Sequence, residues 1–414
     1  MSYQRVKGSY DIVPTSDEAW KESAFWHFIE NHVHTLAKKY TLGEIRPPVF
    51  EYTDLFLRSV GTETDIVSKE MYTFEDRGGR SLSLRPELTA SILRAYIENG
   101  LQQAPSQRYY YLGSCFRYER SQKGRYRQFT QFDVEILGDK DPTVDVEVIS
   151  CFLEFLTNLG LEKYALKINT LGDLISRKNY ITALKEYLET KKHLLSEDSQ
   201  RRLTTNPMRI LDSKEASDQA LLQEAPSLRE FLSEATLSHF QEVCSLLDSL
   251  GISYQIDEKL VRGLDYYMDT VFEVVASDDK GAQNALGGGG RYDGLLKQLG
   301  GPDLPGIGFG IGIERVMQAL IAEGKAPLKE SGPEFFIIPL SKEAKIAAFS
   351  LLQKYRKEGK SALLFNKNFH IKKGLQAAEA MRAQEAVILG EEELEKRVIT
   401  IKNLRTRQER KEPL

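Results

Sequence analysis

The sequence has few of the residues that build disulfide frameworks and zinc sites. Its 414 residues include three cysteines, Cys115, Cys151 and Cys244, with no Cys-x-x-Cys spacing, and six scattered histidines. We therefore expect neither a disulfide scaffold nor a zinc site, and this cysteine usage fits a reducing compartment. The N-terminus has no charged-then-apolar pattern, and no apolar run approaches the ~20 residues of a membrane span. The sequence thus predicts a cytoplasmic protein without a membrane partner.

An overall excess of positive charge is also absent, because the net charge is −4 and the isoelectric point is about 6.0. The chain is therefore no basic nucleic-acid coat, and any nucleic-acid contact must come from a local patch. Residues 116–129 form such a patch, with five basic and four aromatic residues. Strand-like runs at 109–118 and 128–137 flank a turn-like centre, which predicts an antiparallel hairpin with a cationic tip. On its returning strand Gln131, Asp133 and Glu135 share one face, which offers polar groups to a charged ligand.

The chain length predicts two or three domains. Residues 1–173 and 254–326 mix short strands with amphipathic helices and predict an α+β core. Residues 174–253 have helical spacing with almost no strand signal and predict a helical insertion. Residues 330–414 alternate strand and helix and end in a hairpin, which predicts a small α/β domain with a partly parallel sheet. Near the N-terminus, a capping box at 15–18 predicts a helix that ends near Tyr40, followed by a strand over 44–50.

The glycine-rich segment 287–312 fits neither common nucleotide-binding template. It contains no P-loop, and the glycines at 306, 308, 310 and 312 lack the Rossmann spacing. Glycine at every second position predicts a strand with one bare face, against which a flat group can lie. Arg315 follows at the start of a helix, where a guanidinium can stack on a base or hold phosphate.

Three arginines, Arg117, Arg262 and Arg315, stand in separate motifs. Nucleotidyl transfer needs fixed positive charge of this kind around phosphate oxygens. Glu87, Glu119 and Glu135 could bind Mg²⁺ or an amine. Each feature taken singly has an ordinary structural explanation. An arginine on a strand usually forms a salt bridge, a glycine-rich segment is usually a loop, and a Tyr-Tyr pair usually packs in a core. Their joint spacing favours the functional interpretation.

The joint pattern resembles the class II aminoacyl-tRNA synthetases, and within class IIa the histidyl-tRNA synthetase family. Phe116-Arg117-Tyr118-Glu119, followed by Arg125, Phe129 and Asp133, is similar to the second class motif; Pro48 fits the first motif, and 308–315 fits the third. The stretches 260–267, 288–294, 7–11 and 206–212 are similar to signatures of this family. The resemblance covers essentially the whole chain, and class I motifs are absent.

The resemblance implies a ligase that joins L-histidine to the histidine tRNA through a histidyl-adenylate, releasing AMP and pyrophosphate. It implies a class II antiparallel catalytic core, a helical insertion and a C-terminal anticodon-binding α/β domain. Arg262 and Arg117 would be catalytic. ATP would contact Arg117, Glu119, Phe129 and Arg315. Histidine would contact Glu87, Thr89, Arg117, Gln131, Glu135, Arg262, Tyr266 and Tyr267.

Further partners follow from the same resemblance. Arg120, Gln122 and Arg125 at the hairpin tip would contact the acceptor end of the tRNA, with Arg120 and Gln122 reading its extra 5′ guanosine. Mg²⁺ would bind to ATP and not to the protein alone. Residues 17–50 would form a homodimer interface.

The chain departs from the family pattern at a few positions. Leu88 stands where bacterial members usually have glycine, Ser121 where a proline is common, and Thr130 where a histidine is usual. Asp269 follows the Tyr-Tyr pair where an arginine is more typical, and places an acid near Arg262. We expect Ser121 to loosen the hairpin tip.

Two non-charging proteins of related sequence are the alternatives. One is the regulatory synthetase-like subunit of ATP phosphoribosyltransferase, which normally lacks the anticodon domain and has degenerate active-site motifs. The other is a sensor module that binds uncharged tRNA. The intact motif around Arg262 and the C-terminal α/β region favour the enzyme.

Overall fold

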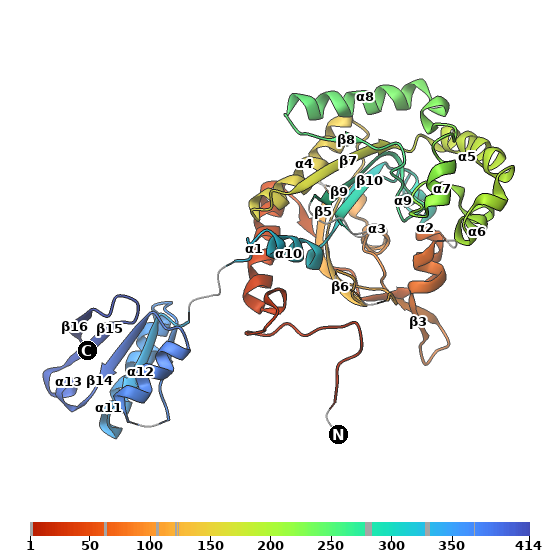
Figure 1. Ribbon diagram of the computed structural model, residues 1–414. Helices are drawn as coiled ribbons and strands as arrows, with labels where there is room; N and C mark the ends of the chain where they lie inside the picture. Colours follow the sequence, from red (N-terminus) through yellow and green to blue (C-terminus); the bar gives the residue numbers. More distant parts are fainter. Residues whose placement is uncertain are drawn as a thin grey trace. The chain divides into compact units, whose positions relative to one another are not determined.

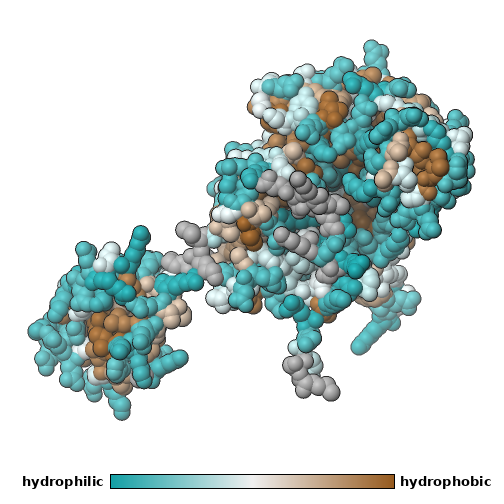
Figure 2. Space-filling view, in the orientation of Figure 1, coloured by the Kyte–Doolittle hydropathy of each residue, from teal (hydrophilic) through white to brown (hydrophobic). Residues whose placement is uncertain are grey.

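The computed structural model describes residues 3–61, 64–104, 107–120, 122, 124–277, 284–327, 332–367 and 369–414 (Figure 1). The chain divides into two compact units, Met1–Pro327 and Leu328–Leu414. On the visible face of each unit most residues are hydrophilic (Figure 2), as expected where the apolar residues fill a core. None of the described helices combines the length and apolarity needed to cross a membrane.

An eight-stranded sheet, counted over the described residues, forms the centre of the first unit. Its order is β1-β5-β6-β11-β10-β9-β7-β8. The strands span Gly43–Glu44 (β1), Arg108–Phe116 (β5), Gln128–Leu137 (β6), Tyr164–Thr170 (β7), Gln255–Ile256 (β8), Met268–Ala276 (β9), Ala285–Arg291 (β10) and Gly306–Gly312 (β11). The five pairs from β5 to β7 are antiparallel, and only the outer pairs β1/β5 and β7/β8 are parallel. The predicted hairpin is confirmed as β5 and β6.

Apolar side chains on one face of this sheet pack against four helices. These are α1 (Ser23–Lys39), α4 (Pro142–Asn158), α8 (Glu234–Ser249) and α10 (Ile313–Ala322). Phe132 on β6 lies 5.1 Å from Phe155 and 5.5 Å from Phe309, between ring centroids. The period of two along β6 places its polar residues Gln131, Asp133 and Glu135 on the opposite face. The core thus fixes the face on which a site can form.

The predicted start of the first helix is wrong. Ser16 Oγ accepts a hydrogen bond only from Glu18 N, at 3.2 Å, and α1 begins at Ser23 after a 3-10 turn at Ala19–Lys21. The cause is aromatic packing, because the Trp20 ring lies 4.8 Å from Tyr10 and 4.9 Å from Tyr126. This cluster holds the segment out of a regular helix.

The predicted strand 44–50 is broken at its two prolines. β1 ends at Glu44, and β2 (Phe50–Tyr52) joins a separate three-stranded sheet with β4 (Ser81–Leu84) and β3 (Tyr72–Glu75). Buried Arg85 ties the break to the main sheet, donating to Pro47 O at 2.8 Å, Ser114 O at 2.7 Å and Tyr111 Oη at 2.7 Å. Helices α2 (Thr53–Val60), α3 (Thr89–Glu98) and α9 (Leu295–Gln298) and a π-helical turn at Ile66–Glu70 complete this part.

The region predicted as a helical insertion is helical. It contains α5 (Leu174–Glu189), α6 (Glu197–Thr205), α7 (Ala216–Leu221) and α8, joined by 3-10 turns. Tyr180, Leu184 and Leu188 form an apolar cluster with Val261 and Tyr267, next to Arg262. Val243 and Leu247 of α8 instead belong to the main core. The boundaries of an insertion at 174 and 253 stay a prediction.

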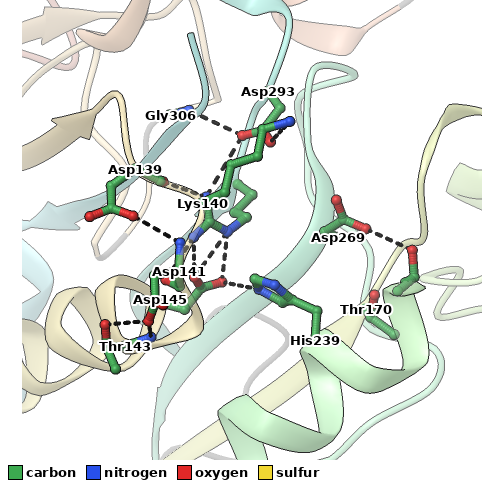
Figure 3. Close-up of polar contacts among 12 residues, drawn as sticks. Asp139, Lys140, Asp141, Thr143, Asp145, Thr170, His239, Asp269, Asp293 and Gly306 are labelled. Atoms are coloured by element: carbon green, nitrogen blue, oxygen red, sulfur yellow. Dashed lines mark hydrogen bonds and ion pairs between the residues drawn. The ribbon is translucent and has the colours of Figure 1, made fainter. Parts of the chain in front are cut away.

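A buried ion pair joins β10 to α4 (Figure 3). The Arg291 guanidinium donates to both carboxylate oxygens of Asp145, and to the carbonyls of Asp139 at 3.0 Å and Asp141 at 3.2 Å. Both side chains are 2% exposed or less. His239 of α8 approaches Asp145 at 3.3 Å. All the charged groups of this pair have protein partners.

The second unit is the α/β arrangement that the sequence predicts. Its sheet has the order β13-β12-β14-β15-β16, with a parallel part formed by β12 (Phe335–Pro339), β13 (Ala362–Leu364) and β14 (Glu385–Leu389). Helices α11 (Lys342–Lys357) and α12 (Ile371–Ala380) make the crossovers that parallel strands require. The antiparallel strands β15 (Val398–Asn403) and β16 (Glu409–Pro413) form the predicted hairpin. A short helix, α13 (Glu391–Lys396), was not predicted.

Candidate active site

A cavity of about 590 Å³ lies over the polar face of the main sheet. Strands β6, β9, β10 and β11, the hairpin tip and the loop 260–267 contribute to it. The following predicted ATP and histidine residues line it: Glu87, Thr89, Arg117, Glu119, Phe129, Gln131, Arg262, Tyr266, Tyr267 and Arg315. Glu135 lies beside it and is 1% exposed. The structure therefore brings together residues that are up to 228 positions apart in the sequence (Glu87 to Arg315).

The glycines of β10 and β11 make room for charged side chains of neighbouring elements. A Cβ added at Gly288 would lie 2.8 Å from Arg262 Nη1, and one added at Gly308 would collide with the Glu135 carboxylate. A Cβ at Gly310 would lie 3.0 Å from Gln131 Nε2. The prediction of a strand with a bare face is confirmed, and part of what covers that face is the protein's own charged groups.

The three predicted arginines all line the cavity. Arg117 donates from Nε to Pro86 O at 2.8 Å, and its guanidinium lies 5.1 Å from the Phe129 ring centroid. Arg315 donates to Gly124 O at 3.1 Å and to Ala285 O at 2.8 Å. Burial lowers the pKa of Arg315, and the positive charges of Arg125 and Arg117 lower it further. An anionic ligand would relieve this repulsion.

Arg262 projects from the loop between β8 and β9. Its Nη1 donates to Glu273 Oε2 at 2.7 Å, while its buried Nε has no hydrogen-bond partner among the described residues. A single ion pair thus leaves most of its five donors for a ligand. Asp269 accepts from Thr236 Oγ1 of α8 at 3.3 Å (Figure 3). Among the described residues the ion-pair partner of Arg262 is Glu273 and not Asp269.

Carboxylates and phenols line or border the same cavity. Glu135 accepts from Thr89 Oγ1 at 2.7 Å and from Tyr292 Oη, and burial raises its pKa to about 8. Glu87 accepts from Ala90 N at 2.9 Å, and burial raises its pKa as well. The rings of Tyr266 and Tyr267 lie 4.7 Å apart. A ligand with N–H donors would satisfy these acceptors.

Sequence reasoning missed several residues that position this site. Tyr292 lies in the quoted motif 288–294 but had no assigned role. Tyr10 donates to Glu314, which also accepts from Thr130 N at 2.7 Å, so the N-terminal segment is tied to the residue before Arg315. Burial raises the pKa of Glu314 to about 7.

A second set of positioning residues comes from the helical region. Arg209 donates to Arg262 O at 3.2 Å, and Asn206 donates to Asp265 Oδ1 at 2.6 Å. Arg177 donates to the carbonyls of Asp265 at 2.9 Å and Tyr267 at 3.1 Å. The motif 206–212 was the signal that could have identified two of them.

Some residues of the hairpin tip face solvent, and others line the cavity. Arg120 and Gln122 are exposed, whereas Arg125 lines the cavity and lies 3.2 Å from Glu119 Oε2. Ser121, which we expected to loosen the tip, lies outside the described residues. Leu88 is fully buried beside Ile92 and Tyr111 and is not part of the cavity lining.

No group of three or more His, Cys, Asp or Glu side chains is placed to hold a metal ion in the described part of the chain. In the cavity, Glu119 and Glu273 are each paired with an arginine, Arg125 and Arg262 respectively. Glu273 thus accepts a hydrogen bond from Arg262, whereas Glu119 Oε2 lies near Arg125 but accepts no hydrogen bond from a described residue.

Comparison with known proteins identifies families and relatives that this chain resembles. A family model described as "Histidyl-tRNA synthetase" matches residues 17–316, and one described as "Anticodon binding domain" matches residues 334–413. The chain is 47% identical over 406 residues to "Histidine--tRNA ligase" of Protochlamydia amoebophila (strain UWE25), covering 98% of this chain and 96% of the relative. It is 45% identical over 409 residues to the Bacillus subtilis (strain 168) protein of that name, covering 98% and 95%.

Solved structures agree with this fold. Apo histidyl-tRNA synthetase of S. aureus matches with a TM-score of 0.84 and 38% identity, covering 100% of this chain and 97% of that one. An ATP phosphoribosyltransferase regulatory subunit/histidyl-tRNA synthetase from Bacillus halodurans C matches with a TM-score of 0.68 and 22% identity, covering 94% and 99%, which shows a shared fold alone. The predicted class II catalytic core with an added anticodon-binding domain is confirmed, and the chain belongs to the histidyl-tRNA synthetase family.

Proposed function

We propose that this protein ligates L-histidine to the histidine tRNA, consuming ATP. The observation that supports this best is that one cavity gathers both cations and acceptors. Arg117, Arg262 and Arg315 supply fixed positive charge, and buried Glu87 and Glu135 supply acceptors in or beside the same cavity. The arginines suit a triphosphate, and the acceptors suit an amino acid with an imidazole.

In the first step the histidine carboxylate attacks the α-phosphorus of ATP, and the bond to pyrophosphate breaks. Arg117 holds the α-phosphate and the amino-acid carboxylate. Arg262 stabilises the charge that develops on the α-phosphate oxygens, because it keeps unpaired donors in a water-poor site. Phe129 and Arg315 enclose the adenine. In the second step the 3′ hydroxyl of the tRNA attacks the carbonyl carbon of the adenylate, and AMP leaves.

Mg²⁺ would be held by the triphosphate, whose oxygens are the ligands that it prefers. When bound, it neutralises part of the charge on the phosphates.

Histidine selectivity would come from acceptors that an analogue leaves unpaired. Glu135 and Tyr267 accept from or donate to the imidazole, Tyr266 lines the pocket, and Glu87, Thr89 and Gln131 fix the amino end. An analogue without imidazole N–H groups would leave buried acceptors without donors, which discriminates by several kcal/mol.

The tRNA would contact both units. Arg120 and Gln122 are exposed at the hairpin tip and free to reach the acceptor end, with Arg125 nearer to the cavity. The second unit would bind the anticodon. We also propose that the protein is cytoplasmic and forms a homodimer through residues 17–50; a stable, active monomer in sedimentation would contradict the dimer.

The test is histidine-dependent exchange of labelled pyrophosphate into ATP by the full-length protein. We expect exchange with histidine and none without it. Folded protein that binds histidine but catalyses no exchange would instead support the regulatory-subunit alternative. Charging of histidine tRNA with and without its extra 5′ guanosine then tests the tip, where an Arg120→Ala/Gln122→Ala variant should lose charging but keep exchange.

A further inference from the structure

Asp133 is a buried carboxylate in the cavity for which the reaction above has no use. It lies on β6 between Gln131 and Glu135, is 3% exposed, and lines the cavity. Its Oδ1 is fully buried and has no hydrogen-bond partner among the described residues. Buried polar groups are nearly always paired, so an orphan oxygen in a ligand cavity indicates a missing donor.

The nearby arginines do not supply that donor. Arg85 directs its hydrogen bonds to the carbonyls of Pro47 and Ser114 and to Tyr111 Oη. The Nε of Arg117 donates to Pro86 O. Burial raises the pKa of Asp133, and the charges of Glu135 and Glu87 raise it further, against the opposing effect of Arg117 and Arg85. The free site therefore disfavours the ionised form of Asp133, which a bound cation would favour.

The glycine of the neighbouring strand lets Asp133 and Gln131 share the cavity face. Asp133 pairs with Gly310 of β11 in the sheet register. A Cβ added at Gly310 would lie 3.1 Å from Asp133 Oδ1 and 3.0 Å from Gln131 Nε2. Both side chains thus lie against the bare backbone of β11 and line the same cavity.

We propose that Asp133 is a further substrate-binding residue, whose carboxylate accepts from the α-ammonium group of histidine beside Gln131. An ammonium has three donors and a full charge, so it fits an orphan carboxylate oxygen better than a neutral imidazole N–H does. Arg117 lines the same cavity, where its guanidinium can pair with the carboxylate of the same amino acid. This inference rests on the proposed function, because it takes histidine as the ligand.

The test compares two histidine analogues by calorimetry on the full-length protein. Histidinol keeps the ammonium and the imidazole but lacks the carboxylate, whereas imidazolepropionate keeps the carboxylate and lacks the ammonium. Asp133→Asn should weaken histidinol binding by about 10- to 100-fold, the range for one lost charge-assisted hydrogen bond. Its affinity for imidazolepropionate should stay within about twofold of wild type, because a merely structural role would affect both analogues.

Asp269→Asn is the matched control. Asp269 is a partly buried acid on the same sheet that is outside the cavity lining and bonds to Thr236. This variant should bind both analogues as the wild type does. Equal losses of both analogues in Asp133→Asn, or no loss of histidinol, would overturn the proposal.

Two further measurements test the proposal if the variant does not fold, and distinguish its failure from failure of the proposed function. If Asp133→Asn does not fold, wild-type protein is titrated in buffers of different ionisation enthalpy at pH 7. Histidinol should then release more protons than imidazolepropionate, because an ammonium favours the ionised carboxylate. The difference should persist in Glu87→Gln, which removes the other acid assigned to the amino end; its loss in that variant, or equal release in wild type, would refute the assignment. Wild-type protein that binds no histidine and catalyses no exchange would contradict the proposed function itself, whereas exchange with an unaffected Asp133→Asn variant would contradict only this inference.

Discussion

The first unit contains two kinds of buried arginine. Comparing them separates residues that stabilise the fold from residues that can act on a ligand. Arg291 and Arg85 are each 1% exposed, and their donors go to carboxylate, carbonyl and hydroxyl oxygens of the protein. Arg262 is as enclosed at its Nε, yet that donor has no partner among the described residues. Burial alone therefore does not distinguish the two kinds; the number of satisfied donors does.

The buried acids divide in the same way. Asp145 is bound by Arg291 through two nitrogens, and Asp218 accepts from Ser199 Oγ and Ser213 Oγ, each at 2.6 Å. Asp133 has an oxygen without a donor in the described structure. A saturated group stabilises the fold, whereas an unsaturated one weakens it until a ligand arrives. Substitutions should therefore destabilise the fold much more in the first set than in the second.

The largest expected effect is on the saturated pair. Arg291→Met leaves the Asp145 carboxylate buried without its partner, which should cost ~3–5 kcal/mol of unfolding free energy. Urea unfolding followed by tryptophan fluorescence measures it, because both tryptophans of the chain, Trp20 and Trp26, lie in the first unit. The double variant Asp145→Leu/Arg291→Met should recover part of the loss. Stability equal to wild type in Arg291→Met would contradict the support role.

An unsaturated arginine should show the reverse behaviour. Arg262→Ala should leave ATP and histidine binding within a few-fold but slow pyrophosphate exchange by about 10²–10³-fold, because Arg262 acts on charge that exists only in the transition state. Its unfolding free energy should change little in comparison with that of Arg291→Met. A loss of binding as large as the loss of rate would refute the transition-state role.

A smaller effect is expected from the pH dependence of Glu135. Its pKa is raised to about 8 in the folded protein, against 4.5 as the usual value. The folded state therefore holds a proton between these values that the unfolded state has released, so this residue's contribution to stability falls as pH rises toward 8. Glu135→Gln should gain stability relative to wild type from pH 5.5 to pH 7.5, by up to ~1.4 kcal/mol per pH unit. The same fluorescence assay without ligand measures it.

Asp218→Asn supplies the control for that pH series. Burial acts to raise the pKa of Asp218, but its serine and backbone hydrogen bonds outweigh burial and hold the pKa below its usual value. Its contribution is present above the unfolded pKa and is lost only as pH falls through the lower folded value. The difference between Asp218→Asn and wild type should therefore be constant from pH 5.5 to pH 7.5. A rise like that of Glu135→Gln would indicate a general pH effect.

Local patterns in the sequence predicted the residues of the cavity better than those of the supporting ion pair. Alternation along 128–137 predicted that Gln131, Asp133 and Glu135 share a face, and alternate glycines predicted the bare strand β11. The family resemblance then assigned roles to Arg117, Arg262 and Arg315. All of these signals lie within short segments, where the periodicity of a strand decides which way a side chain points.

The hydrogen-bond partners of a buried group could not be predicted from local sequence patterns. Tyr292 and Glu135 are 157 residues apart, and Tyr10 and Glu314 are 304 apart, so only the folded sheet brings them together. The predicted start of the first helix was wrong for a similar reason, because the tertiary stacking of Trp20 on Tyr126 overrides a local capping signal. The orphan oxygen of Asp133 is likewise a property of its surroundings and not of its motif.

The smallest expected effect tests whether a bidentate ion pair must be buried to stabilise the fold. Arg410 on β16 donates to Glu385 Oε2 at 2.7 Å and to Glu412 Oε1 at 2.8 Å, in a geometry like that of Arg291, but its side chain is 46% exposed. Water and salt screen such a pair, so Arg410→Ala should cost less than ~1 kcal/mol. Hydrogen exchange of the β14–β16 amides in the full-length protein, at low salt and at 1 M salt, measures the change. We expect a small loss of protection that disappears at high salt; a loss as large as that of Arg291→Met would mean that geometry, and not exclusion of water, sets the strength of these pairs.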